Sequence, residues 1–262
     1  DLVIGLGAIV PHRVKGFSGG AKIAFPGVSG REMMDANQWD ASLRMAETVM
    51  GVAENPMRAR MEAAARLVGL RYIVNAVQDR DGRLAGCFAG DLVAAHRAGC
   101  ALAREVYRAD LAARADIVVI DAHPADRDLW QSVKALYAGS LAVRRGGTLV
   151  VVAPNPEGVA SNHPVLMKMG YRPHAEIIEK VAAGVDDLVG VAILADIAQI
   201  VDHADCVMVS PGVSRDDCAR LGMRRAATAD DALAMAFERQ GSDARVAVLH
   251  HGGHILPVVR EG

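Results

Sequence analysis

The stretch that most constrains the fold is a near-continuous apolar run at residues 116–121, Asp-Ile-Val-Val-Ile-Asp. Such a run is typical of a strand that is buried on both faces of a parallel sheet. Further strands are expected at 147–153, 205–209 and 245–249, and helices at about 128–144 and 174–184. Because strands that alternate with helices indicate an α/β unit, this part of the chain is predicted to form a small parallel-sheet domain.

The residues before position 112 follow a different pattern, so we place a domain boundary there. Here we expect helices at 30–51, 56–68 and about 91–107, and strands at 70–78 and 83–89 that are joined by an Asp81-Gly82 hairpin turn. The final segment contains glycine and proline and is expected to run back to the first domain. The predicted architecture is α/β, with a cleft between two domains that comprise residues 1–111 plus 243–262 and residues 112–242.

The composition excludes several classes of protein. The 262 residues are 52% hydrophobic and 23% charged, which suits one large or two ordinary globular domains. The net charge of −2 gives no electrostatic reason to bind nucleic acid or an anionic membrane, and no apolar run approaches the ~20 residues of a membrane span. The four cysteines lack Cys-x-x-Cys spacing, which favours buried thiols and a cytoplasmic protein. Since the chain starts inside a strand pattern, we expect an upstream portion outside this sequence.

A glycine-rich loop at residues 11–27 is the first candidate site. It follows residues 2–10, whose apolar pattern predicts a buried strand, and loops held on such strands often carry reactive groups. Three glycines in five residues, at 16, 19 and 20, permit backbone conformations in which the amides could cradle an anion. The loop is neither a nucleotide-binding P-loop, because Lys22 is followed by Ile23, nor a dinucleotide fingerprint, because the first Gly-x-Gly runs into Pro11.

Two side chains of this loop suit acid-base or covalent chemistry. His12 has an ordinary pKa of about 6.5 and so exchanges protons near neutral pH. Lys22 becomes a nucleophile if Arg13, Lys15 or a dry pocket keeps its amine partly neutral. The alternative is a structural glycine-rich turn that carries a surface lysine and a histidine held by the backbone.

A second candidate lies after the apolar strand of the second domain. Gln131 and Lys134 are three residues apart, so on a helix they share a face, and an amide beside a point cation suits a carboxylate. A solvated polar helix face would explain the same spacing. Three aspartates or three histidines elsewhere in the sequence could bind a metal ion, although capping explains the aspartates and the spacing of the histidines is poor for a metal site. Two polar stretches have the character of an ordered loop after a strand, which in α/β proteins points toward the site. These groups are Asp121, Asp126 and Asp128, the loop residues 155–158 and 161–164, and His250, His251 and His254.

Taken together, the loop and the later helix resemble the nickel-dependent lactate racemase family, whose members carry a nickel-pincer nucleotide. The matching stretches are Pro11-His12, Gly16 to Lys22, Pro26-Gly27 and Gln131 to Lys134. The resemblance covers only the later part of a family member. It implies that Lys22 attaches the cofactor through a thioamide, and that His12 is one of two histidines that exchange a proton with the substrate hydroxyl. It further implies cofactor contacts at Gly16, Phe17, Ser18, Gly19, Gly20 and Pro26.

The same resemblance implies that Gln131 and Lys134 hold the substrate between the domains, and that the second catalytic histidine lies upstream. Two positions depart from the family: Gln38 stands where a histidine binds nickel, and Trp130 where tyrosine is common. An amide oxygen is a poorer nickel ligand than imidazole.

The implied activity is racemisation or epimerisation of a small, lactate-like 2-hydroxy acid, with the cofactor-synthesis proteins as partners. Removal of the hydroxyl proton together with hydride transfer to the cofactor, and return of the hydride to the other face, would invert the carbon. Two alternatives stay open. One is a non-catalytic homologue that binds a nucleotide-like anion at the Gly16 to Lys22 loop; the other is an anion- or sugar-phosphate-binding enzyme with an unmodified Lys22.

Overall fold

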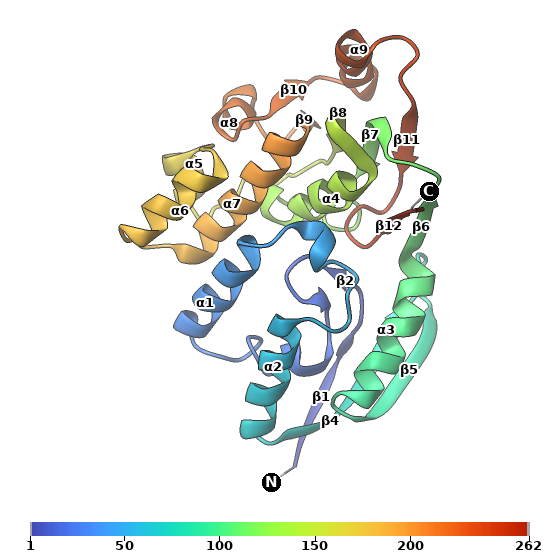
Figure 1. Ribbon diagram of the computed structural model, residues 1–262, viewed down its shortest axis with the longest axis vertical. Coiled ribbons are helices and arrows are strands. Elements are labelled where there is room, and N and C mark those ends of the chain that lie inside the picture. The colour runs from blue at the N-terminus through green and yellow to red at the C-terminus, as the bar shows by residue number, and fades with distance from the viewer. Residues whose placement is uncertain (1, 261–262) are drawn as a thin grey trace. The chain divides into compact units, whose positions relative to one another are not determined.

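The computed structural model describes residues 2–260 and divides the chain into two compact units, Asp1–Arg108 and Ala109–Gly262 (Figure 1). None of the helices in this described range is long and apolar enough to cross a membrane. Each unit has its own sheet and its own set of helices, as the alternation of patterns in the sequence predicts.

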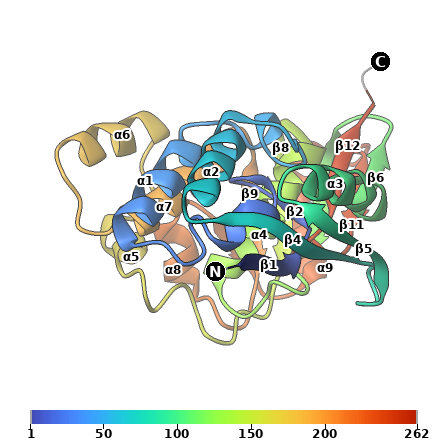
Figure 2. The same ribbon diagram turned by 90° about the horizontal axis from the view of Figure 1, so that it is seen from below.

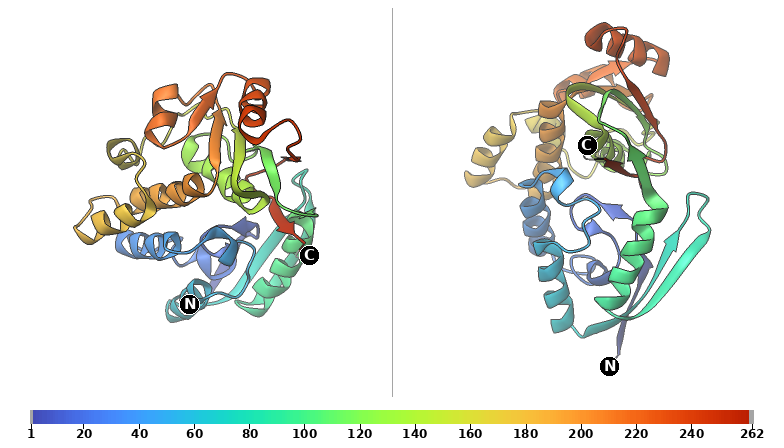
Figure 3. Two further views of the ribbon diagram at one scale, coloured as in Figure 1. Left: turned by 45° about the horizontal axis from the view of Figure 1, so that its top comes forward. Right: turned by 45° about the vertical axis from the view of Figure 1, so that its right-hand side comes forward.

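The first unit is built on a three-stranded sheet in the order β1-β4-β5. Its strands are β1 (Val3–Ala8), β4 (Leu70–Gln78) and β5 (Leu84–Asp91). β1 pairs with β4 in parallel, and β4 and β5 form an antiparallel hairpin that lies along helix α3 (Ala94–Tyr107) (Figure 3, right). The predicted hairpin turn is confirmed, since the amide of Asp79 donates to the carbonyl of Arg83 at 2.8 Å.

β1 is an edge strand, and this corrects the prediction that residues 2–10 form a buried strand (Figure 2). Of its six residues only Gly5 is buried, whereas Ile4 and Leu6 are 49% and 70% exposed. The core of the unit lies on the other elements: Met61 and Ala65 of helix α2 (Pro56–Leu67) pack with Ile73 of β4.

Helix α1 (Arg31–Ser42) is shorter than the helix predicted over 30–51. The chain is extended at Met45, with ψ of 142°, and then forms the short 3-10 turn η2 (Ala46–Thr48). The hydroxyls of Ser42 and Thr48 donate to the carbonyls of Trp39 and Met45, each at 2.8 Å, which satisfies acceptors where the helical pattern stops.

The second unit contains a five-stranded parallel sheet in the order β10-β9-β8-β7-β11, which confirms the predicted parallel α/β architecture. The helices α4 and α7 pack on one face of this sheet and α9 on the other. On the α9 face, Ala232 and Ala236 of that helix pack on three strand residues, Ile117, Val150 and Val207. The strands are β7 (Ala115–Asp121), β8 (Val143–Val152), β9 (Asp205–Val209), β10 (Arg224–Ala226) and β11 (Val246–Leu249). The helices are α4 (Leu129–Ala142), α5 (Val165–Met169), α6 (His174–Ala182), α7 (Leu188–His203), α8 (Arg215–Arg220) and α9 (Ala229–Gln240).

The prediction that residues 243–262 return to the first domain is not what the structure shows. β11 pairs in parallel with β7, inside the sheet of the second unit, where its apolar residues cover the edge of that strand. β12 (Leu256–Val259) pairs with β6 (Arg108–Leu111) and packs against α4. The described part of the final segment therefore belongs with the second unit, and the division falls after residue 108.

Candidate functional site

The glycine-rich loop of the first unit folds back on itself directly after β1. A short hairpin pairs β2 (Pro11–His12) with β3 (Gly16–Phe17), and the 3-10 turn η1 (Gly20–Ile23) follows and carries Lys22. Gly16 and Gly20 have φ of 75° and 58°. A side chain at Gly16 would place its Cβ 1.9 Å from the carbonyl oxygen of Val52, and one at Gly20 would lie 2.7 Å from the ring of His96. The glycines are therefore required by the chain's own close packing.

Three amides of this loop donate within the chain, so these three are not free to cradle an anion. The amide of Ser18 donates to the carbonyl of Val10 at 2.9 Å, and that of Gly20 donates to Asn75 Oδ1 at 2.7 Å. The amide of Lys22 donates to the carbonyl of Gly19 at 3.2 Å. These three amides therefore support the path of the loop itself.

Arg58 of α2 holds the loop from behind. Its side chain is fully buried, and its guanidinium donates to the carbonyls of Lys15 (3.2 Å), Gly19 (3.1 Å) and Phe17. Burial lowers the pKa of Arg58 to about 10, which leaves it charged at neutral pH. One planar side chain thus fixes three carbonyl oxygens of the segment between the two reactive residues.

His96 supports the same loop from α3. Its Nε2 lies 2.9 Å from the carbonyl oxygen of Ser18, and burial, with the charge of Arg58, lowers the pKa of its ring to about 3. A neutral ring donates to this carbonyl through Nε2–H. We therefore assign His96 a structural role, although its residue type alone would suggest acid-base chemistry.

His12 and Lys22, the two predicted reactive residues, are both half-buried and lie on this one supported segment. The amide of Val14 donates to Nδ1 of His12 at 3.1 Å, so the neutral ring carries its proton on Nε2. The charge of Lys22 lowers the pKa of Lys15, which means that the two amines lie near each other.

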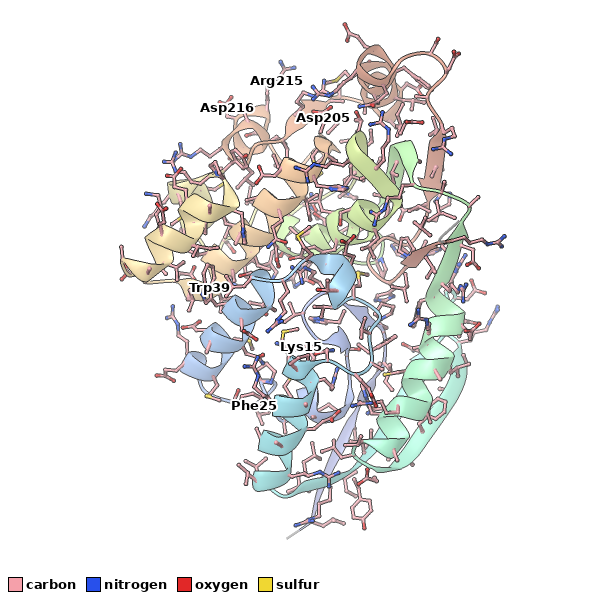
Figure 4. The ribbon with its side chains drawn as sticks, viewed as in Figure 1. Lys15, Phe25, Trp39, Asp205, Arg215 and Asp216 are labelled. Carbon is pink, nitrogen blue, oxygen red and sulfur yellow. The ribbon has the colours of Figure 1, made fainter. Side chains whose placement is uncertain are left out.

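Lys15 is a buried amine that sequence reasoning treated only as a neighbour of Lys22. It is 1% exposed, and its Nζ donates to both the backbone and the side-chain oxygen of Asn37 in α1 (Figure 4). Burial first, and then the charge of Lys22, lowers its pKa to about 7. Lys15 thus joins the loop to the helix that carries Gln38.

The residues of the first unit fit attachment of an organic group better than they fit a protein-built metal site. Lys22 offers an amine on a supported turn, whereas half-buried Gln38 offers only an amide where nickel prefers imidazole. Within residues 2–260, no three histidine, cysteine, aspartate or glutamate side chains are grouped so that they could hold a metal ion. This also removes the metal interpretation of His250, His251 and His254.

In the second unit, the predicted pair Gln131 and Lys134 lies on the first turns of α4. Asp128 caps this helix, because its Oδ1 accepts from the amide of Gln131 at 2.8 Å, so capping explains this aspartate. Lys134 Nζ donates to Gln131 Oε1 at 2.9 Å. Burial lowers the pKa of Lys134, and the negative charge of Asp128 opposes that shift.

The three C-terminal histidines lie at the same edge of the sheet, after β11. Asp121, at the end of β7, accepts from Nδ1 of His250 at 2.9 Å and from the amide of His251 at 3.2 Å. His254 has its pKa lowered to about 4 by burial and then by the charges of Lys134, His251 and His123. The structure thus brings His254 close to Lys134, a neighbour that sequence spacing did not predict.

Trp130, next to Gln131, is covered by the loop at 161–164. Its ring stacks on His163 with centroids 4.1 Å apart and an interplanar angle of 11°. Nδ1 of His163 lies 2.9 Å from Asp187 Oδ2, and Asp187 caps α7 through the amide of Gly190. The loop whose chemistry the sequence left unassigned therefore packs on the residue beside the predicted carboxylate-binding pair.

Comparison with known proteins identifies two family models along the chain. The lactate racemase C-terminal domain matches residues 111–256, more than half of the chain, and the lactate racemase N-terminal domain matches residues 1–49. The lactate racemase of Lactiplantibacillus plantarum is 29% identical over 264 residues, which cover 96% of this chain and 60% of that protein. The lactate racemase of Thermoanaerobacterium thermosaccharolyticum is 28% identical and is covered over 62% of its length.

Solved structures give the same relationship. The apoprotein structure of the lactate racemase from Thermoanaerobacterium thermosaccharolyticum superposes with a TM-score of 0.86 at 27% identity, covering all of this chain and 63% of that one. A Thermotoga maritima protein superposes with a TM-score of 0.80 at 19% identity and shares the fold. The chain therefore spans about three fifths of the length of the curated relatives it matches.

Proposed function

Because the chain belongs to the lactate racemase family, we propose that it takes part in the racemisation or epimerisation of a small, lactate-like 2-hydroxy acid. The observation that carries the proposal is that both predicted sets of reactive residues occupy supported positions in the structure. His12 and Lys22 lie on the segment that Arg58 fixes, and Gln131 and Lys134 are hydrogen-bonded to each other on α4.

In this proposal Gln131 and Lys134 bind the substrate carboxylate. An ammonium provides a point charge and the amide provides a directional donor, which together suit one carboxylate. Partial burial strengthens the attraction, because charges interact more strongly away from water. The hydroxyl of the same substrate is the group that His12 is proposed to serve.

His12 exchanges a proton with the substrate hydroxyl at Nε2. The hydrogen bond from Val14 to Nδ1 places the proton of the neutral ring on Nε2. For Nε2 to accept a proton, Nδ1 must hold the ring's own hydrogen and release the amide of Val14. Proton exchange is thereby coupled to this backbone contact, which favours return of the ring to one tautomer.

Lys22 is the residue proposed to hold a nickel-pincer nucleotide, with side chains near the loop as its contacts. Such a cofactor supplies a hydride-accepting carbon when it is bound. The proteins that synthesise it are then partners of this chain. Gln38 at the family's nickel-ligand position favours a second candidate function, a divergent homologue that binds a nucleotide-like anion or cofactor without racemising.

The test uses the protein produced together with the cofactor pathway. An intact-mass increase that maps to Lys22, with interconversion of the enantiomers of lactate or of a related 2-hydroxy acid, supports the racemase. Lys22→Ala should abolish both the mass increase and turnover, and His12→Ala only turnover, while the control Lys180→Ala, a half-exposed lysine of α6, should change neither. A mass increase without turnover across a panel of chiral hydroxy acids supports the second candidate, and an unmodified Lys22 refutes both cofactor proposals.

Gln38→His tests the departure at the metal position. An imidazole there should raise the nickel retained per chain after dialysis, since imidazole binds nickel better than an amide. Unchanged nickel content would show that position 38 does not face the metal.

A further inference from the structure

The turn that joins β11 to β12 is packed tightly against the end of β7, the loop that follows β7, and α4. A side chain at Gly252 would place its Cβ 2.3 Å from the carbonyl oxygen of Asp121 and 2.8 Å from Cβ of Ala135. At Gly253 the Cβ would meet Ala125 at 2.9 Å. Because neither glycine has room for a side chain, the turn is held at a fixed place beside the helix that carries Lys134.

This packing arranges nitrogen-bearing side chains around one point. His251 has a left-handed backbone, with φ of 61°, which is uncommon for a residue other than glycine. Its ring lies edge-on to that of His123, with centroids 5.6 Å apart. His254, one helical-type turn further on, donates its amide to the carbonyl of His251 at 2.9 Å.

Several cationic groups act on His254. The pKa of its ring is lowered by burial, by Lys134 of α4, by His251 of its own turn and by His123 of the loop after β7. Two carboxylates at this edge are engaged by other groups. Asp121 accepts from His250 and from the amides of His123 and His251, and Asp126 Oδ2 lies 3.9 Å from Nδ1 of His123.

The location is one where ligands bind in proteins of this architecture. β7 and β11 run in parallel and end together, with Leu249 in register with Ile120. Ligands of open parallel sheets bind beyond the carboxyl ends of the strands. Lys134 brings an ammonium with three donors to this edge and gives one of them to Gln131.

We propose that His254 is a further substrate-binding residue, which shares the carboxylate of a small organic acid with Lys134 and Gln131. The inference rests on the proposed function for the role of Lys134 and Gln131 and adds the turn after β11 to that site. A carboxylate bound there lies between the ammonium of Lys134 and the ring of His254. The negative charge of the carboxylate favours the protonated form of His254, so the acid is bound between two cations.

This arrangement couples binding to protonation. In the free protein the ring of His254 is neutral near pH 7, because its pKa is lowered to about 4. A bound carboxylate offsets the charge of Lys134 and raises that pKa, so the complex takes up a proton as the pH falls. By linkage, the affinity for the carboxylate rises by up to about tenfold for each unit that the pH falls, over the pH range in which one proton is taken up with each carboxylate bound.

The test measures equilibrium binding of sodium lactate to the full chain, without cofactor, by titration calorimetry at pH 7, 6 and 5. Lactate stays an anion over this range. In the wild type the affinity should rise by at least about threefold from pH 7 to pH 5, and Lys134→Gln should weaken binding at least about tenfold at all three pH values. His254→Gln should weaken binding at pH 5 and flatten the pH dependence, because glutamine cannot be protonated.

His203→Gln is the matched control. This histidine lies at the end of α7, where its Nε2 is 3.2 Å from the carbonyl oxygen of Val143 at the start of β8, the opposite edge of the same sheet. It should retain the affinity and pH dependence of the wild type. If His254→Gln behaves like this control, or if the wild type binds no lactate, the proposal is refuted. Should His254→Gln fold poorly, His254→Asn provides the same comparison.

The outcome is independent of turnover. Lactate binding with the predicted His254 dependence, in a protein that racemises nothing after cofactor loading, would support this site and refute the racemase. If the protein racemises a hydroxy acid but its affinity for lactate is unchanged in His254→Gln, the racemase is supported and the role of His254 is refuted.

Discussion

Replacement of Arg58 by methionine tests whether one buried side chain supports the reactive loop. Methionine keeps much of the aliphatic volume but removes the guanidinium that donates to the carbonyls of Lys15, Phe17 and Gly19. Each buried acceptor left without its donor costs about 1–3 kcal/mol. Three such losses, which share one site and do not fully add, give an expected decrease of roughly 3–6 kcal/mol in the free energy of unfolding.

A decrease of that size is a large part of the stability of an ordinary domain, about 5–15 kcal/mol. It is measured by urea denaturation of Arg58→Met beside Arg66→Met, a substitution on the same helix. Arg66 makes a surface ion pair with Asp91 at 3.4 Å, with both side chains more than two fifths exposed, so its loss should cost no more than about 1 kcal/mol. Arg58→Lys should recover only part of the loss, because an ammonium lacks the planar fork that reaches three oxygens.

Hydrogen exchange localises the effect. The amides of Ser18, Gly20 and Lys22 are hydrogen-bonded within the chain and should lose protection in Arg58→Met, while those of the β4–β5 hairpin change less. An Arg58→Met protein that unfolds within about 1 kcal/mol of Arg66→Met, with these amides still protected, would refute the reasoning.

Two further predictions concern groups that the structure buries. The pKa of Lys15 falls from 10.5 to about 7 on folding, so between these values the unfolded chain binds more protons and stability should rise with pH, by at most about 1.4 kcal/mol per unit. Lys15→Met should flatten that rise in denaturation curves at pH 7, 8 and 9, and an unchanged slope would show that the amine titrates normally. Gly252→Ala should lower the free energy of unfolding by about 1–3 kcal/mol, because its Cβ would meet the backbone of Asp121 at 2.3 Å. Gly30→Ala, whose nearest atom is the flexible carboxylate of Glu32 at 3.3 Å, is its control, and equal thermal denaturation of the two would contradict the crowding argument.

The elements that sequence reasoning predicted well are those with a local signal. The β4–β5 hairpin follows from its turn residues, β7 from an apolar run, and α4 from a capping aspartate with a helical spacing behind it. α7 was missed because it is apolar almost all round: ten of its residues are buried, so no polar face marks its period. β1 was expected to be buried because apolarity alone cannot distinguish a central strand from an edge.

The same distinction holds for the candidate site. The pairing of Gln131 with Lys134 follows from their spacing, and the structure shows the hydrogen bond. The role of Arg58 could not be predicted from the sequence. Its partners are backbone carbonyls 39 to 43 positions away, and every residue has such a carbonyl, so no residue pattern marks them. His254 lies near Lys134 because β11 pairs with β7, and the sequence marks 245–249 as a strand without indicating which strand is its partner.

Support of the loop through carbonyl oxygens also bears on how such a protein changes during evolution. Every amino acid carries the same carbonyl group, so the contacts of Arg58 do not depend on which side chains stand between β2 and η1. A half-buried position such as 22 can therefore change its side chain while these contacts of Arg58 are kept. New chemistry can thus be selected at this loop without a new scaffold.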